Sequence, residues 1–94
     1  MDTRLEEAYE ALAVHGISDR YGLVPEIVDE WYRLQHDKRV AAEERPAVLL
    51  ERIEAMLRAR HAGSPLLLFI IMQLAPVIIK ILLEHWLNKT KPVI

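Results

Sequence analysis

The chain of 94 residues contains no cysteine. This absence excludes disulfide bonds, thiolate metal sites and a cysteine nucleophile. Glycine is also scarce, because its three residues stand singly and follow no phosphate-binding pattern. No serine lies in a nucleophile elbow, and the four histidines are scattered without the spacing of metal ligands. We therefore expect a protein that is not an enzyme and has no metal and no cofactor.

The first ten residues, MDTRLEEAYE, lack the apolar core that a secretory signal peptide needs. We therefore expect a protein that is not secreted, and any membrane insertion to use the carboxy-terminal segment. The net charge of −2 conceals an asymmetry, since residues 1–40 carry nine acidic and five basic side chains. Residues 66–94 carry three lysines and one glutamate. The front of the chain is acidic and its tail is basic.

Residues 65–87 read PLLLFIIMQLAPVIIKILLEHWL, which is a nearly unbroken apolar run. As a helix that rises about 1.5 Å per residue, this run would extend roughly 34 Å, enough to cross a hydrocarbon core of about 30 Å. It would also suit the centre of an oligomer, because the other apolar stripes of the chain are too narrow to cover it. We expect the run to lie in a membrane or in a protein core.

No segment alternates with the period of two that strands show, so we predict an all-α fold. A small helical head of three to four short helices precedes one long hydrophobic helix, in which Pro76 should produce a kink. The expected domains are the head at 1–62, the hydrophobic helix at 65–88 and a short basic tail at 89–94. The expected head helices, bounded by caps, prolines and glycines, cover 3–15 with Thr3 as the cap, 17–21, 25–37 and 46–62.

Small and apolar residues recur around a glycine between residues 17 and 31. Gly22 stands at the turn, the small Ser18 precedes it, and the apolar positions are Ile17, Tyr21, Leu23, Val28 and Trp31. This spacing resembles the helix-turn-helix of many bacterial and phage repressors and transposases. The resemblance implies a compact helical unit whose second helix enters the major groove of DNA.

The outward positions of that second helix do not suit DNA. They are Val24, Pro25, Glu26, Asp29 and Glu30, and three of them are carboxylates that would face phosphate. We therefore expect no nucleic-acid partner, and a head that contacts protein instead. The candidate docking residues are Trp31 and Tyr32, as aromatic residues typical of interfaces, together with Glu26, Asp29 and Glu30.

Polar residues form one narrow stripe on the hydrophobic helix. Gln73, Lys80, Glu84 and Lys91 are spaced by seven, four and seven residues, which places them on one face. In a bilayer such residues usually face a neighbouring helix or water, so Gln73, Lys80 and Glu84 are candidates for a helix interface and favour a homo-oligomer. A simpler alternative is a slightly polar anchor whose ends lie at the membrane interface, with Arg58, Arg60, Trp86 and Lys89 near lipid headgroups.

The sequence thus predicts a structural or assembly protein that tethers a protein partner through its head to a membrane or an oligomeric assembly. A small subunit of a membrane complex and a minor virion protein both have this layout. We expect membrane association, with lipid as a partner and the head in the cytoplasm or the virion interior. Two alternatives stay open, a helix-turn-helix DNA-binding regulator and a small pore-forming, holin-like membrane protein.

Overall fold

The computed structural model describes residues 2–89, and within them every regular element is helical, so the fold is all-α as predicted. The final stripe residue, Lys91, lies outside the described residues. The elements are α1 (Thr3–Val14), α2 (Leu23–Gln35), the short 3-10 helix η1 (Ala42–Glu44), α3 (Arg45–Arg60) and α4 (Pro65–Lys89).

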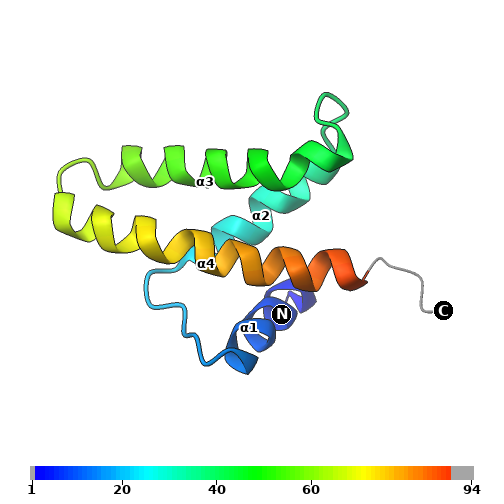
Figure 1. The fold of residues 1–94 in the computed structure, drawn as a ribbon, viewed down its shortest axis with the longest axis horizontal. Helices are drawn as coiled ribbons and strands as arrows, with labels where there is room; N and C mark the ends of the chain where they lie inside the picture. The colour runs from blue at the N-terminus through cyan, green and yellow to red at the C-terminus, as the bar shows by residue number, and fades with distance from the viewer. Residues whose placement is uncertain (1, 90–94) are drawn as a thin grey trace.

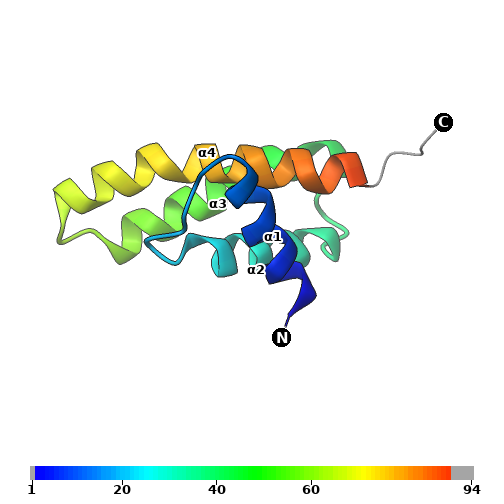
Figure 2. The same ribbon diagram turned by 90° about the horizontal axis from the view of Figure 1, so that it is seen from below.

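Helices α3 and α4 form a long antiparallel hairpin, joined by a tight turn at residues 61–64 (Figure 1). Helix α2 crosses one side of the hairpin, and α1 packs against both α2 and α4 (Figure 2). Both views show the end of the hairpin where α3 passes into α4 projecting beyond α2. The two ends of α4 therefore have different surroundings.

A single hydrophobic core joins all four α-helices. Its fully buried side chains recur at helical spacing, which gives each helix one inner face. Those from the first three helices include Ala8, Leu12, Leu23, Ile27, Leu34, Leu49, Ile53 and Leu57, and those from α4 include Ile71, Ala75, Ile78 and Leu82. The hydrophobic helix thus packs on the head and shares its core. The division of the chain into domains at residue 62 stays a prediction.

The amino-terminal end of α1 differs from the prediction, and its carboxy-terminal end agrees with it. Asp2, not Thr3, is the amino-terminal cap, because its carboxylate accepts a hydrogen bond of 3.0 Å from the backbone N–H of Arg4. At the other end Gly16 has a φ of +71°, and the N–H of Ile17 donates to the carbonyl of Leu12 over 3.0 Å. The glycine closes the helix as expected.

The helix predicted at residues 17–21 is wrong, because this segment is an irregular connection between α1 and α2. The carboxylate of Asp19 accepts hydrogen bonds from the N–H groups of Leu23 at 2.8 Å and Val24 at 3.0 Å. These bonds cap the start of α2, and Gly22 turns into it with a φ of +70°. Five residues are also too few to offset the cost of nucleating a helix. The resemblance to a helix-turn-helix therefore loses its first helix.

Helix α4 continues without interruption through Pro76. The proline has no N–H to donate to the carbonyl four residues earlier, so one bond of the helical ladder is missing there. The predicted kink at this position stays a prediction.

Candidate functional site

Helix α4 has one face in the core and one face in solvent. Ile71, Ala75, Ile78 and Leu82 are at most 1% exposed, and their spacing follows the helical period. The predicted stripe residues Gln73, Lys80 and Glu84 lie on the opposite face, and all three are exposed. The structure therefore leaves these three stripe residues accessible, and their role as a helix interface stays a prediction.

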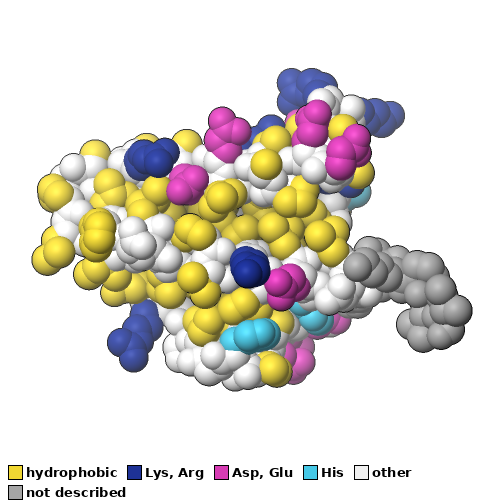
Figure 3. All heavy atoms as spheres, viewed as in Figure 1, with side chains coloured by type: hydrophobic (Ala, Val, Ile, Leu, Met, Phe, Trp, Pro, Cys, Tyr) yellow, Lys and Arg dark blue, Asp and Glu magenta, His cyan; other side chains and the backbone are white. Residues whose placement is uncertain are grey.

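Apart from Gln73, the exposed face of α4 is apolar along its first half. Leu66 is 75% exposed, Phe69 63%, Ile70 42% and Val77 46%. We call these four residues the α4 apolar face. Figure 3 shows hydrophobic side chains gathered over this end of the hairpin. Large apolar side chains grouped at the surface mark contact sites more often than scattered ones do.

Within the described residues, one helix is long and apolar enough to cross a membrane, and it is α4 over residues 65–88. One third of its most apolar window is buried inside the bundle. Length and composition alone do not separate a membrane span from the core helix of a soluble protein.

The two aromatic docking candidates have different surroundings. Trp31 is only 7% exposed and stacks on Trp86 of α4, with ring centroids 5.3 Å apart and planes 7° from parallel. Tyr32 is 47% exposed, and the guanidinium of Arg4 lies 4.4 Å from its ring centroid. Trp31 therefore belongs to the contact between α2 and α4, whereas Tyr32 is accessible to a partner.

The three acidic docking candidates on α2 all form ion pairs within the chain. Glu26 pairs with Arg60, and Glu30 pairs with Arg52 over 2.9 Å, so both link α2 to α3. Asp29 pairs with Arg33 over 3.0 Å along α2 itself. Partly exposed pairs of this kind contribute at most about 1 kcal/mol each. Their main effect is to reduce the charge that α2 presents to any partner.

The residues predicted at a membrane interface are also divided. Arg58 is exposed, and no ion pair with another described residue involves it. Arg60 is held by Glu26, and Trp86 faces the head through its stack on Trp31. The side chain of Lys89 is outside the described part of the structure. Arg58 is thus the basic candidate with the most freedom to reach a headgroup.

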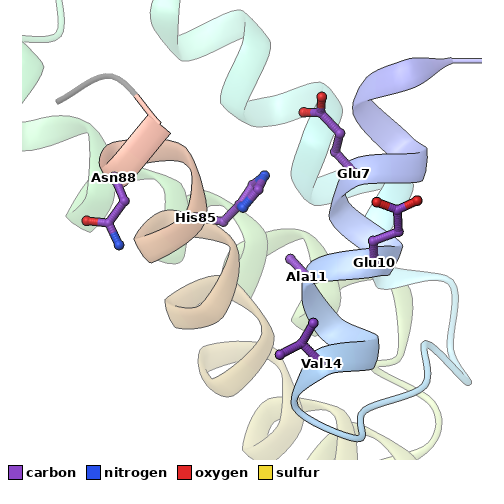
Figure 4. Close-up of a pocket in the computed structure, with 6 residues that line it drawn as sticks. All are labelled: Glu7, Glu10, Ala11, Val14, His85 and Asn88. Atoms are coloured by element: carbon purple, nitrogen blue, oxygen red, sulfur yellow. The ribbon is translucent and has the colours of Figure 1, made fainter. Parts of the chain in front are cut away.

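A groove between α1 and α4 was not predicted from the sequence. Glu7, Glu10, Ala11, Val14, His85 and Asn88 line a hollow of about 690 Å³, and Figure 4 shows Ala11, Val14 and His85 pointing into the space between the two helices. A smaller adjoining hollow of about 240 Å³ adds His15, Ile81 and Glu84. We call the two hollows together the α1–α4 groove. Val14 is 84% exposed beside these hollows, and only the fold shows which helix lies next to it.

The connection after α2 contains a local charge pair. The guanidinium of Arg39 donates to the carboxylate of Asp37 at 3.0 Å and 3.1 Å, and the backbone N–H of Arg39 donates to it at 3.0 Å. These hydrogen bonds stabilise the ionised form and lower the pKa of Asp37 from its ordinary 3.8 to about 2. The pair orders the connection between α2 and η1 and is remote from the groove.

No group of three or more side chains suited to a metal ion occurs within residues 2–89. Comparison of the chain with protein-family models, with curated proteins and with solved structures finds no match in any of the three. The two surfaces of the molecule that suit a contact are the α4 apolar face and the α1–α4 groove.

Proposed function

We propose that this protein is a non-enzymatic assembly protein that tethers a protein partner to a membrane surface, with the α4 apolar face as its lipid contact. The observation that carries the proposal is the exposure of Leu66, Phe69, Ile70 and Val77 on one face of α4. Fully burying a large apolar side chain is worth about 1.5–3 kcal/mol. Scaled by the exposed fractions, transfer of this face into lipid would contribute on the order of 4 kcal/mol.

The charges around this face support lipid as the contact. The sequence has no Asp or Glu between Glu54 and Glu84, whereas it has Arg58, Arg60 and Lys80 there. Arg58 is exposed beside the turn that leads into α4. A basic side chain near a membrane surface adds about 1 kcal/mol of attraction to anionic lipid. The apolar face and Arg58 together suit an anionic bilayer better than a neutral one.

The packing of α4 supports attachment to the surface with the bundle intact. A helix that spans the bilayer alone would have to leave the core and remove Ile71, Ile78 and Leu82 from it. Opening the core in this way would cost a large part of the 5–15 kcal/mol by which domains are usually stable. A face that is already exposed can enter the headgroup region at no such cost. We place the head on the cytoplasmic or virion-interior side, in keeping with a chain that has no cysteine.

Flotation of the full-length protein with vesicles tests the proposal. The double variant Phe69→Ser, Ile70→Ser should float roughly thirtyfold less well than the parent protein, because it removes about half of the exposed apolar surface. Val14→Ser is the matched control, since it changes an 84% exposed apolar residue on α1 and should leave flotation unchanged. Vesicles with anionic lipid should bind more protein than neutral vesicles, and high salt should reduce this difference.

Two results would overturn the surface attachment. Resistance of the bound protein to alkaline carbonate would show that α4 spans the bilayer. The second result is that the parent protein does not float and is a dimer, whereas the Phe69→Ser, Ile70→Ser variant is a monomer. This would show that the face pairs two copies of the chain. Circular dichroism of each variant checks that the helices persist.

A further inference from the structure

We infer that the α1–α4 groove is where the protein partner docks, and that the partner contributes a basic amphipathic helix. The tethering role of this contact rests on the proposed function, but the contact itself does not depend on a membrane. The inference starts from the shape of the groove, which extends along α1 from Glu7 to Val14. At about 1.5 Å per residue this is roughly two helical turns, enough to seat two turns of a partner helix.

The floor of the groove is apolar. Ala11 and Val14 of α1 face Ile81 of α4 across it, and Val14 is 84% exposed although it is a large aliphatic residue. An aliphatic side chain from a partner would cover Val14 and remove it from water. Helices that dock into grooves present such side chains at every third or fourth position.

The rim of the groove is acidic. Glu7 and Glu10 line it from α1, and Glu84 lines it from α4. The other polar lining residues are His15, His85 and Asn88, and no Lys or Arg is among the lining side chains that the structure describes. Lysine or arginine side chains that flank an apolar stripe would therefore meet the carboxylate of Glu10 on one wall and that of Glu84 on the other. Charge complementarity selects a basic partner helix over an acidic or a neutral one.

One wall of the groove also contains a polar atom without a partner. The Nε2 atom of His85 is buried and has no hydrogen bond among the described residues. Figure 4 shows the imidazole of His85 directed from α4 towards α1. A buried polar atom of this kind is unfavourable until it is paired.

The α1–α4 groove begins about one helical turn beyond Val77, the last residue of the α4 apolar face, and continues towards the carboxy-terminal end of α4. From Phe69 to His85 the distance along α4 is about 24 Å, because a helix rises about 1.5 Å per residue. Figure 1 shows α1 beside the later half of α4, away from the hairpin turn. A partner seated beside His85 would thus be held clear of a surface that Leu66, Phe69 and Ile70 contact, and these two contacts could form at once.

Binding of a designed peptide to the full-length protein tests the inference. The probe is a fluorescent helical peptide with a leucine stripe flanked by lysines, and its sister peptide has glutamate in place of each lysine. We expect fluorescence anisotropy to detect binding of the lysine peptide alone. The double variant Glu10→Gln, Glu84→Gln should weaken binding roughly fivefold to tenfold, since it removes one carboxylate from each wall. Val14→Ser should weaken it by about threefold through the loss of apolar contact.

Matched variants locate the contact. Glu43→Gln, Glu51→Gln makes the same change of charge at two exposed residues outside the groove and should alter binding by less than about twofold. Equal loss of binding in this control, equal binding of the glutamate peptide, or unchanged binding in the Glu10→Gln, Glu84→Gln variant would each overturn the inference. The Phe69→Ser, Ile70→Ser variant should bind the peptide normally. If the parent protein floats with vesicles but does not bind the lysine peptide, the groove contact alone is refuted. If the parent protein binds the peptide but does not float, the membrane contact alone is refuted.

Discussion

Truncation of one side chain on the inner face of α4 tests whether this helix belongs to the core of the head. Leu82 is fully buried where α4 packs on the bundle. Leu82→Ala leaves a cavity in that core, and such substitutions cost about 3 kcal/mol, within a usual range of about 2–5 kcal/mol. At a slope of about 1 kcal/mol per M for a small domain in urea, the unfolding midpoint should fall by about 3 M. The melting temperature should fall by roughly 12–24 °C.

The stacked pair of Trp31 and Trp86 supplies the assay. The two indole rings lie on α2 and α4, 5.3 Å apart, so separation of α4 from the head changes their fluorescence. Urea unfolding of Leu82→Ala would be followed at this signal, beside Val77→Ala as the control. Val77 is on the same helix but 46% exposed, and alanine has the higher helix propensity, so the control should shift stability by less than about 1 kcal/mol.

Equal and small shifts for Leu82→Ala and Val77→Ala would refute the reasoning, because they would mean that α4 does not pack through this face. The comparison can be repeated with anionic vesicles. If the protein attaches by its apolar face with the bundle intact, the difference between the two variants persists on the vesicles. If α4 leaves the bundle to span the bilayer, the difference disappears.

Two further predictions concern the connections on either side of α2. Asp19→Ala removes the acceptor of the hydrogen bonds from Leu23 and Val24 and should lower the free energy of unfolding by about 1 kcal/mol in urea titration; an unchanged midpoint would show that the cap contributes nothing. Because the pKa of Asp37 is lowered from 3.8 to about 2 by Arg39, the stability from this pair is complete above the higher value and is lost as the pH falls towards the lower one. Asp37→Asn should therefore show a smaller fall in urea midpoint across this pH interval than the parent protein, and parallel pH profiles would contradict the assignment.

Local signals in the sequence predicted the helices well where they are strong. Gly16 ends α1 because a left-handed backbone suits glycine, and Pro65 begins α4 because a helix tolerates proline in its first turn. The error at residues 17–21 has a local cause too. Asp19 looks compatible with a short helix, but its carboxylate is used to cap the next one. A residue that can cap from a distance of four or five positions is hard to recognise without the backbone.

The contacts among the candidate residues could not be predicted, because they join elements far apart in the chain. Trp86 was assigned to the lipid headgroups from its position alone, and its stack on Trp31 could not be read from the sequence. Glu26 and Arg60 were assigned to different contacts and form an ion pair with each other. The α1–α4 groove lies between the first helix and the last one, so no local pattern could indicate it.

The sequence by itself determined that the chain is all-α and that residues 65–88 form one long apolar helix, because helical periodicity, caps and hydrophobicity act over short distances. The stripe of Gln73, Lys80 and Glu84 was likewise readable from spacing alone. The stripe also marks the side of α4 that stays exposed, and only the tertiary structure decided that the helices of the same chain cover the opposite side. That packing leaves Leu66, Phe69, Ile70 and Val77 in solvent and places α1 beside the other end of α4, because one helix in a small bundle can be covered on one side only.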